Sequence, residues 1–213
     1  MNTYSKAVRP DGTDFYTGTV QWAPPEGHEG EWIVRHPTAL TIGDTADQYL
    51  SVSTVATDCT HMAWPCRLLT VEAVGDVTAP TPSLPRKRAG VTFRVTGELP
   101  AHETFGPQGE SVAALIERAG HLTASEIQTL AAARAAERAA AWDAAWVAAW
   151  AAAWDVAGGA ARAASRAPAR DAACALVVRD LITTDHYNIL TRTWREVIGP
   201  IHPDDPDMRG DTP

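Results

Sequence analysis

The 213-residue sequence lacks any long apolar run. A membrane-spanning helix needs about 20 predominantly apolar residues. The Ala-rich stretch that comes closest is interrupted by Arg138, Asp143 and Asp155. The opening MNTYSKAVRPDG also lacks the apolar segment of a secretory signal peptide. We therefore expect a soluble, cytoplasmic protein that has no membrane partner.

Positive charge is also scarce. The chain has 18 Lys and Arg against 26 Asp and Glu, which gives a net charge of −8. A protein that follows nucleic-acid phosphates needs clustered cations. Here the basic residues are scattered, apart from the run 85–88, which is interpreted as a solvated loop. Together these features argue against a nucleic-acid partner.

Cysteine is rare, and the odd number of three argues against a disulfide framework. Cys59, His61 and Cys66 form a Cys-x-His-x4-Cys cluster of residue types that bind zinc. Zinc takes a fourth ligand; Cys174 lies on a separate helical segment, and His36 is the plausible upstream candidate. Buried structural cysteines are the favoured interpretation, and no metal is expected.

The residues present in the first half have the period of β-strands. Four segments are rich in β-branched or aromatic residues: EWIVRHP, QYLSVSTV, CRLLTVEAVG and GVTFRVTGEL. In the last of them, Val91, Phe93 and Val95 alternate with polar residues, which is typical of a half-buried strand. The Pro-rich stretch 78–90 predicts a loop. We expect a mostly β domain over residues 1–100.

The period becomes helical after a connector at 101–110, with apolar residues three and four apart from 112 to 119. Several residues favour helix ends: Gly120 as a C′ glycine, Thr123 with Glu126 as a capping box, Pro168 and Thr184 as helix starts, and Gly199-Pro200 as a stop. The pattern predicts an α-helical bundle or hairpin array over 111–199. An acidic, mobile tail is expected over 200–213.

One Ala-rich helix holds half of the tryptophans: Trp142, Trp146, Trp150 and Trp154. Each step of four residues advances the helix by about 400°, so the four indoles sweep about 120° of its surface. That width is typical of the buried face of a globular helix, and a core role is favoured. The alternative is a partner-binding surface at Trp150 and Trp154, because Trp is enriched in binding hot spots.

Four motifs follow one another in the first half: Phe15-Tyr16-Thr17-Gly18-Thr19, Tyr49-Leu50-Ser51-Val52-Ser53, Val71-Glu72-Ala73-Val74-Gly75 and Phe93-Arg94-Val95-Thr96-Gly97-Glu98. In order and spacing they resemble the strands of the small ADP-ribosyltransferases that inactivate rifamycin antibiotics. The resemblance covers about residues 4–99 and implies an ADP-ribosyltransferase-like β domain in an α+β chain. It also implies five ligand-binding candidates: Tyr16, Thr17, Gly18, Tyr49 and Ser51.

The sequence departs from that family at its reactive groups. Thr17 stands where the family has a His of the nicotinamide site, and the loop at 78–90 has no carboxylate where the family has a catalytic Asp. Tyr49 and Glu72 are the catalytic candidates that remain, although a solvent-facing strand position also explains Glu72. We therefore expect no cofactor, and NAD or another nucleotide only if the domain keeps the family's ligand.

The opening YSKAVRPDGTDFYTG and the Ala/Trp-rich helix also resemble a group of proteins from actinobacteria and their phages. This resemblance covers nearly the full length and implies a phage accessory protein, without a biochemical role. The favoured hypothesis is a protein that acts by protein–protein interaction, through a degenerate transferase-like domain and the helical module. Its partner is then a host or phage protein, or a second copy. The alternative is an ADP-ribosyltransferase or a protein that sequesters a nucleotide.

Overall fold

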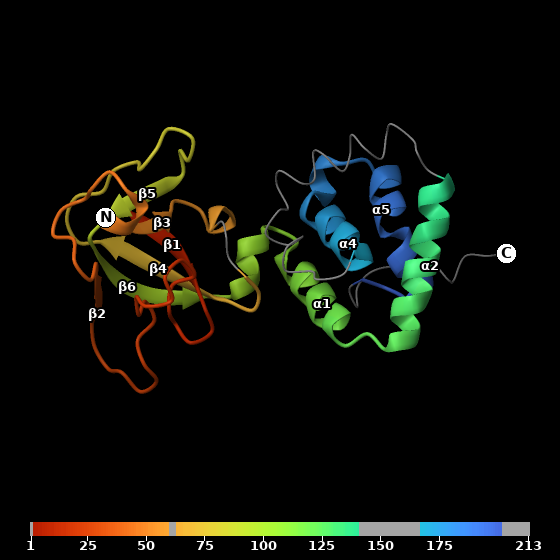
Figure 1. Ribbon diagram of the computed structural model, residues 1–213, viewed down its shortest axis with the longest axis horizontal. Helices are drawn as coiled ribbons and strands as arrows, with labels where there is room; N and C mark the ends of the chain where they lie inside the picture. Colours follow the sequence, from red (N-terminus) through yellow and green to blue (C-terminus); the bar gives the residue numbers. More distant parts are fainter. Residues whose placement is uncertain (1, 60–62, 141–166, 202–213) are drawn as a thin grey trace. The chain divides into compact units, whose positions relative to one another are not determined.

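The computed structural model describes residues 2–59, 63–140 and 167–201 (Figure 1). The chain divides into two compact units, Met1–Gly106 and Pro107–Pro213. Its class is mixed α+β, because the first unit holds an antiparallel sheet and the described part of the second is helical. The division falls inside the 101–110 stretch that the sequence analysis treats as a connector.

The sheet has six strands in the order β2-β6-β4-β1-β3-β5, and every neighbouring pair is antiparallel. The strands are β1 Thr3–Val8, β2 Trp32–Arg35, β3 Leu50–Ser53, β4 Arg67–Ala73, β5 Lys87–Gly90 and β6 Thr92–Leu99. Three short 3-10 helices accompany them: η1 Ala46–Gln48, η2 Ala56–Asp58 and η3 Ala101–Phe105. All four segments expected to form strands from their period do so.

The core of the first unit lies on one face of this sheet. Tyr4, Val8, Val71 and Phe93 are buried there, and Trp22 from the loop after β1 completes the cluster. On the opposite face of β4, Leu68 is also fully buried, because η3 packs against that strand. This second cover explains why the alternation in β4 is weaker in the sequence than that in β6.

Two expectations in the first unit are wrong. Residues 14–20, the first motif of the resemblance, form a turn and not a strand, because the Asp14 carboxylate accepts hydrogen bonds from the backbone amides of Thr17 and Val20. The stretch 78–90 is not a loop throughout, because Lys87–Gly90 forms β5 and pairs with β3. Lys87 and Arg88 are consequently half-buried, and the run 85–88 is not fully solvated. The period-2 analysis also missed β1.

The second unit contains α1 Gly109–Gly120, α2 Ala124–Ala140, α4 Ala167–Val177, η4 Arg179–Leu181 and α5 Thr184–Val197. α4 packs against α1, α2 and α5. Every residue from 171 to 176 is buried, so α4 is covered on all sides and not on one face alone. Its small Ala residues at 172, 173 and 175 let the neighbouring helices approach closely.

Helix ends in this unit follow the sequence in part. Thr123 and Glu126 form the expected capping box, with Glu126 N donating to Thr123 Oγ1 at 3.2 Å and Thr123 N to Glu126 Oε2 at 2.7 Å. Gly120 is not a C′ residue, because α1 includes it and His121 is the C-cap. The last helix is capped by Thr183 and not by Thr184, since Thr183 Oγ1 accepts from the His186 amide at 3.2 Å.

No helix in the part of the chain described by the structure has the length and apolar character to cross a membrane. The tryptophan ladder at 142–154, His61 and the tail from residue 202 lie outside the described residues. The expectations for them remain predictions.

Candidate functional site

The sheet is joined unevenly at its centre. β1 pairs with β4 along its whole length, from Thr3 to Val8, but it pairs with β3 only through Ser5 and Ser53. Beyond that single pair, the Ser51 carbonyl accepts a hydrogen bond from a side chain, Lys6 Nζ, at 2.9 Å. We call this region the β1–β3 junction and define it by Lys6, Ser51, Ser53, Cys59 and Lys87.

Lys6 is a cation on the apolar side of the sheet. Side chains alternate along a strand, so Lys6 lies on the same face as its neighbours in the core, Tyr4 and Val8. Its Nζ lies 4.7 Å from the centroid of the Trp22 ring, a cation–π contact. Burial lowers the pKa of Lys6 from 10.5 to about 8; the charge of Asp14 acts against this shift, and that of Lys87 adds to it.

Lys87 lies on the opposite face of the sheet from Lys6. Its register partner is Ser53, which pairs in turn with Ser5, and Ser5 and Lys6 point to opposite faces because they are neighbours in β1. Lys87 Nζ donates to Ser53 Oγ at 2.8 Å, and Ser53 Oγ donates to the Asp58 carbonyl at 2.9 Å. Burial lowers the pKa of Lys87 as well. Burial raises the pKa of the Cys59 thiol, and the nearby Lys87 charge is the largest influence in the opposite direction. The junction thus gathers two amines, a thiol and a hydroxyl.

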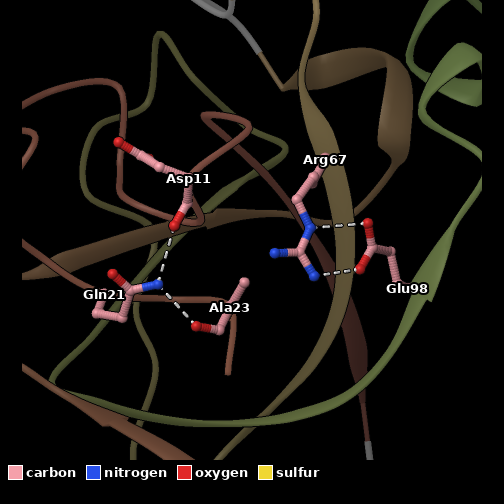
Figure 2. A network of polar contacts seen from close by, with 5 residues as sticks. All are labelled: Asp11, Gln21, Ala23, Arg67 and Glu98. Carbon is pink, nitrogen blue, oxygen red and sulfur yellow. Dashed lines mark hydrogen bonds and ion pairs between the residues drawn. The ribbon is translucent and has the colours of Figure 1, made fainter. Parts of the chain in front are cut away.

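The loop after β1 is built around two aspartates. Asp11 Oδ1 accepts from the Thr13 amide at 2.9 Å. Gln21 Nε2 donates to the backbone carbonyls of Asp11 at 3.2 Å and Ala23 at 2.8 Å (Figure 2). The same view shows the ion pair between Arg67 and Glu98, in which Arg67 Nη2 and Glu98 Oε2 are 2.6 Å apart. The hydrogen bonds of Asp11 and Gln21 join the two ends of the loop, and the Arg67–Glu98 ion pair joins β4 to β6.

The second aspartate fixes the turn that carries three of the ligand-binding candidates. Asp14 accepts from Thr17 N at 2.6 Å, from Thr17 Oγ1 at 2.7 Å and from Val20 N at 3.0 Å. Gly18 adopts φ +69°, and the Arg9 guanidinium occupies the space where a Cβ would lie. Tyr16 projects from this turn with 75% of its surface exposed. Asp14 is close enough to Lys6 to affect its pKa, so the turn lies near the junction.

The two catalytic candidates do not come together. Glu72 pairs in register with Thr3, at the start of β1. Tyr49 precedes β3, and the Ser5–Ser53 pair places it beyond the other end of β1. The separation is about six residues along the strands, or about 20 Å. Glu72 also lies 3.6 Å from Arg94 in an ion pair, which supports its interpretation as an outward-facing strand residue.

The cysteines are buried thiols, as expected from their odd number. Burial raises the pKa of the Cys66 thiol to about 11, and Cys59 adds to this shift, so the two cysteines lie close together. Among the described residues no group of three His, Cys, Asp or Glu is placed to hold a metal ion. His61 lies outside the described residues, so the Cys59–His61–Cys66 cluster itself stays a prediction.

The two lysines of the junction were not among the predicted site residues, although the sequence contains a signal for them. Only two of its 18 Lys and Arg residues are lysines, Lys6 and Lys87, and both lie at the β1–β3 junction. Arg is charged at all accessible pH values, whereas Lys loses its proton when its pKa is lowered by burial. A chain that uses Arg for nearly all of its positive charge thus has its side-chain amines in one place.

Comparison of the chain with protein-family models, with curated proteins and with solved structures found no match.

Proposed function

We propose that this protein acts by binding another protein and does not transfer ADP-ribose. The observation that carries the proposal is the exposed Tyr16 on a turn whose backbone is fixed by Asp14. Tyr is enriched in binding hot spots. An aromatic side chain on a rigid turn loses little backbone entropy when it enters a pocket of a partner.

The separation of Tyr49 from Glu72 supports the second half of the proposal. Displacement of nicotinamide from NAD needs groups that stabilise one developing positive centre. Residues about 20 Å apart cannot share one centre. The degenerate domain then serves as a scaffold for the turn, in keeping with the rule that fold alone does not determine function. The resemblance of the opening to actinobacterial and phage proteins favours a host or phage protein as the partner.

Photo-crosslinking in cells tests this proposal. A benzophenone amino acid at position 16 is expected to give one discrete adduct, whose mass distinguishes a second copy from another protein. Leu40 is the matched control, because it is 92% exposed but lies outside the Asp14 turn. The same label at position 40 should give no discrete adduct.

Two results would contradict the proposal. One is equal crosslinking at positions 16 and 40, which would mean that exposure alone determines the adducts. The other is nicotinamide release from NAD by the purified protein that is lost in Tyr49→Phe.

In an Asp14→Asn background the adduct at position 16 should fall, because the turn loses the carboxylate that orders it.

A further inference from the structure

The β1–β3 junction holds a lysine in surroundings that suit amine chemistry. Lys6 Nζ has two contacts among the described residues, the Ser51 carbonyl at 2.9 Å and the Trp22 ring at 4.7 Å. An ammonium group carries three N–H donors. One donor is therefore not used by the described residues, and Lys6 keeps partial exposure.

We propose that Lys6 captures a small apolar aldehyde or ketone covalently, as an imine at the β1–β3 junction. The neutral Nζ attacks the carbonyl carbon and forms a carbinolamine. The C–O bond then breaks, and the oxygen leaves as water while the C=N bond forms. The net step consumes one carbonyl compound and releases one water, and it needs no oxidant or reductant.

The contacts of Lys6 fit the product as well as the free amine. A protonated imine keeps one N–H, which suffices for the Ser51 carbonyl. Its positive charge still faces the Trp22 ring and remains near the Asp14 carboxylate. Tyr4, Val8 and Leu50 belong to the core cluster on the same side of the sheet, so the site favours a carbonyl compound with an apolar substituent.

The charged groups around Lys6 determine how much neutral amine is present. Asp14 in the turn and Cys59 after η2 favour the charged form, whereas burial and Lys87 on β5 favour the neutral one. With the pKa at about 8, the neutral share at pH 7 is about 300-fold larger than at 10.5. Desolvation and the charge of another cation are both known means of making a lysine amine nucleophilic.

Reductive alkylation of the full-length protein tests the proposal. Propionaldehyde and cyanoborohydride convert imines to stable propyl-lysine, and peptide mass spectrometry gives the alkylation rate of Lys6. We expect Lys6 at pH 7 to react at least about tenfold faster in the folded protein than in concentrated urea, because a less basic amine is also a weaker nucleophile and retains part of the 300-fold gain. In the folded protein the rate should be half-maximal near pH 8.

The sign of this difference separates the proposal from a purely structural role. A lysine that is only buried is protected by the fold, so its alkylation is faster in urea. A rate in the folded protein that is equal to or below the rate in urea would overturn the proposal. Lys6→Arg keeps the cation near Trp22 and Asp14 and removes the reactive amine, so this variant must lose the adduct at position 6 while it retains the unfolding midpoint of the parent. Lys87, the other lysine, is the internal comparison and should react more slowly than Lys6.

Discussion

Two aspartates six residues or fewer from β1 make similar contacts with different consequences. Asp11 accepts from Thr13 in an exposed turn. Asp14 is buried and orders the turn that carries Tyr16. Burial alone would raise the pKa of Asp14, but the hydrogen bonds from Thr17 and Val20, with the Lys6 charge, hold it below 3.8. Asp14 therefore contributes stability above its unfolded pKa, and this contribution is lost as the pH falls through the folded pKa.

Asp14→Asn should lower the free energy of unfolding at pH 7 by about 1–3 kcal/mol, since the amide replaces a charged acceptor of several hydrogen bonds. Asp11→Asn is the matched control and should have a much smaller effect, because water reaches that turn. Urea unfolding followed by Trp fluorescence measures both variants. Equal losses would mean that the burial of Asp14 adds nothing. As the pH falls through the folded pKa of Asp14, the difference between Asp14→Asn and the parent should narrow.

The contribution of Lys6 to stability also rises with pH, but in the alkaline range. Its folded pKa of about 8 lies below the unfolded value of 10.5, so between these values the unfolded chain binds more protons and stability rises with pH. The raised pKa of Cys59 acts in the other direction, but it is shared by a Lys6→Met variant. The unfolding free energy of the parent minus that of Lys6→Met should rise by on the order of 2 kcal/mol from pH 8 to pH 10. A constant difference would show that Lys6 does not titrate in this range.

At the scale of the element, one threonine begins the last helix and its neighbour does not. Thr183 is the N-cap of α5 and accepts from the His186 amide, whereas Thr184 is the first helical residue. Thr183→Ala should lower the unfolding free energy by about 1 kcal/mol, and Thr184→Ala should cost much less. Thermal unfolding followed by circular dichroism at the helix band compares the two. A larger loss for Thr184→Ala would move the helix start back to the position expected from the sequence.

The elements differ in how well the sequence predicted them. β6 and α1 have one buried face each, so period alone located them. β5 was missed because its residues, Lys87 to Gly90, are polar or small and are held by pairing with β3 and not by an apolar face. The turn at 14–20 was expected to be a strand only from the resemblance of its motif, whereas the Asp14 carboxylate determines the local backbone. A pattern of apolar residues shows neither the pairing of strands that are distant in the sequence nor the hydrogen bonds that a side-chain carboxylate accepts from the backbone.

The same limit applies to the candidate site. Four of the ligand-binding candidates were singled out from a resemblance: Ser51, Tyr16, Thr17 and Gly18. Among the described residues, the structure links Ser51 to the turn of the other three through Lys6, which donates to the Ser51 carbonyl and feels the charge of Asp14. Lys6 was not found because it lies at a core position of β1, where an apolar residue is expected. The Lys6 side chain donates to the Ser51 carbonyl in place of a backbone amide of β1. This role exists because β1 and β3 pair only at Ser5 and Ser53, and that separation is set by tertiary structure.

At the scale of the whole molecule, the position of the boundary between the units decides what each unit keeps. The change of period suggested a β domain that ends at residue 100, but the first compact unit extends to Gly106. The difference is η3, whose Thr104 and Phe105 are buried. The Phe105 ring lies 5.0 Å from that of Trp64, and η3 covers the face of β4 that carries Leu68.

Two fragments test this boundary. A fragment of residues 1–106 should fold alone and unfold cooperatively in urea. It contains the sheet, the loop with Trp22 that covers one face and η3 that covers the other. A fragment of residues 1–100 should be less stable by about 3–5 kcal/mol, the usual cost of removing a buried Phe side chain. Since small domains have only about 5–15 kcal/mol of stability, this loss would leave much of the shorter fragment unfolded at 37 °C. Amide NMR spectra and urea titrations of the two fragments give the comparison. Equal stability would show that η3 is a connector after all, and that the buried Leu68 does not need its cover.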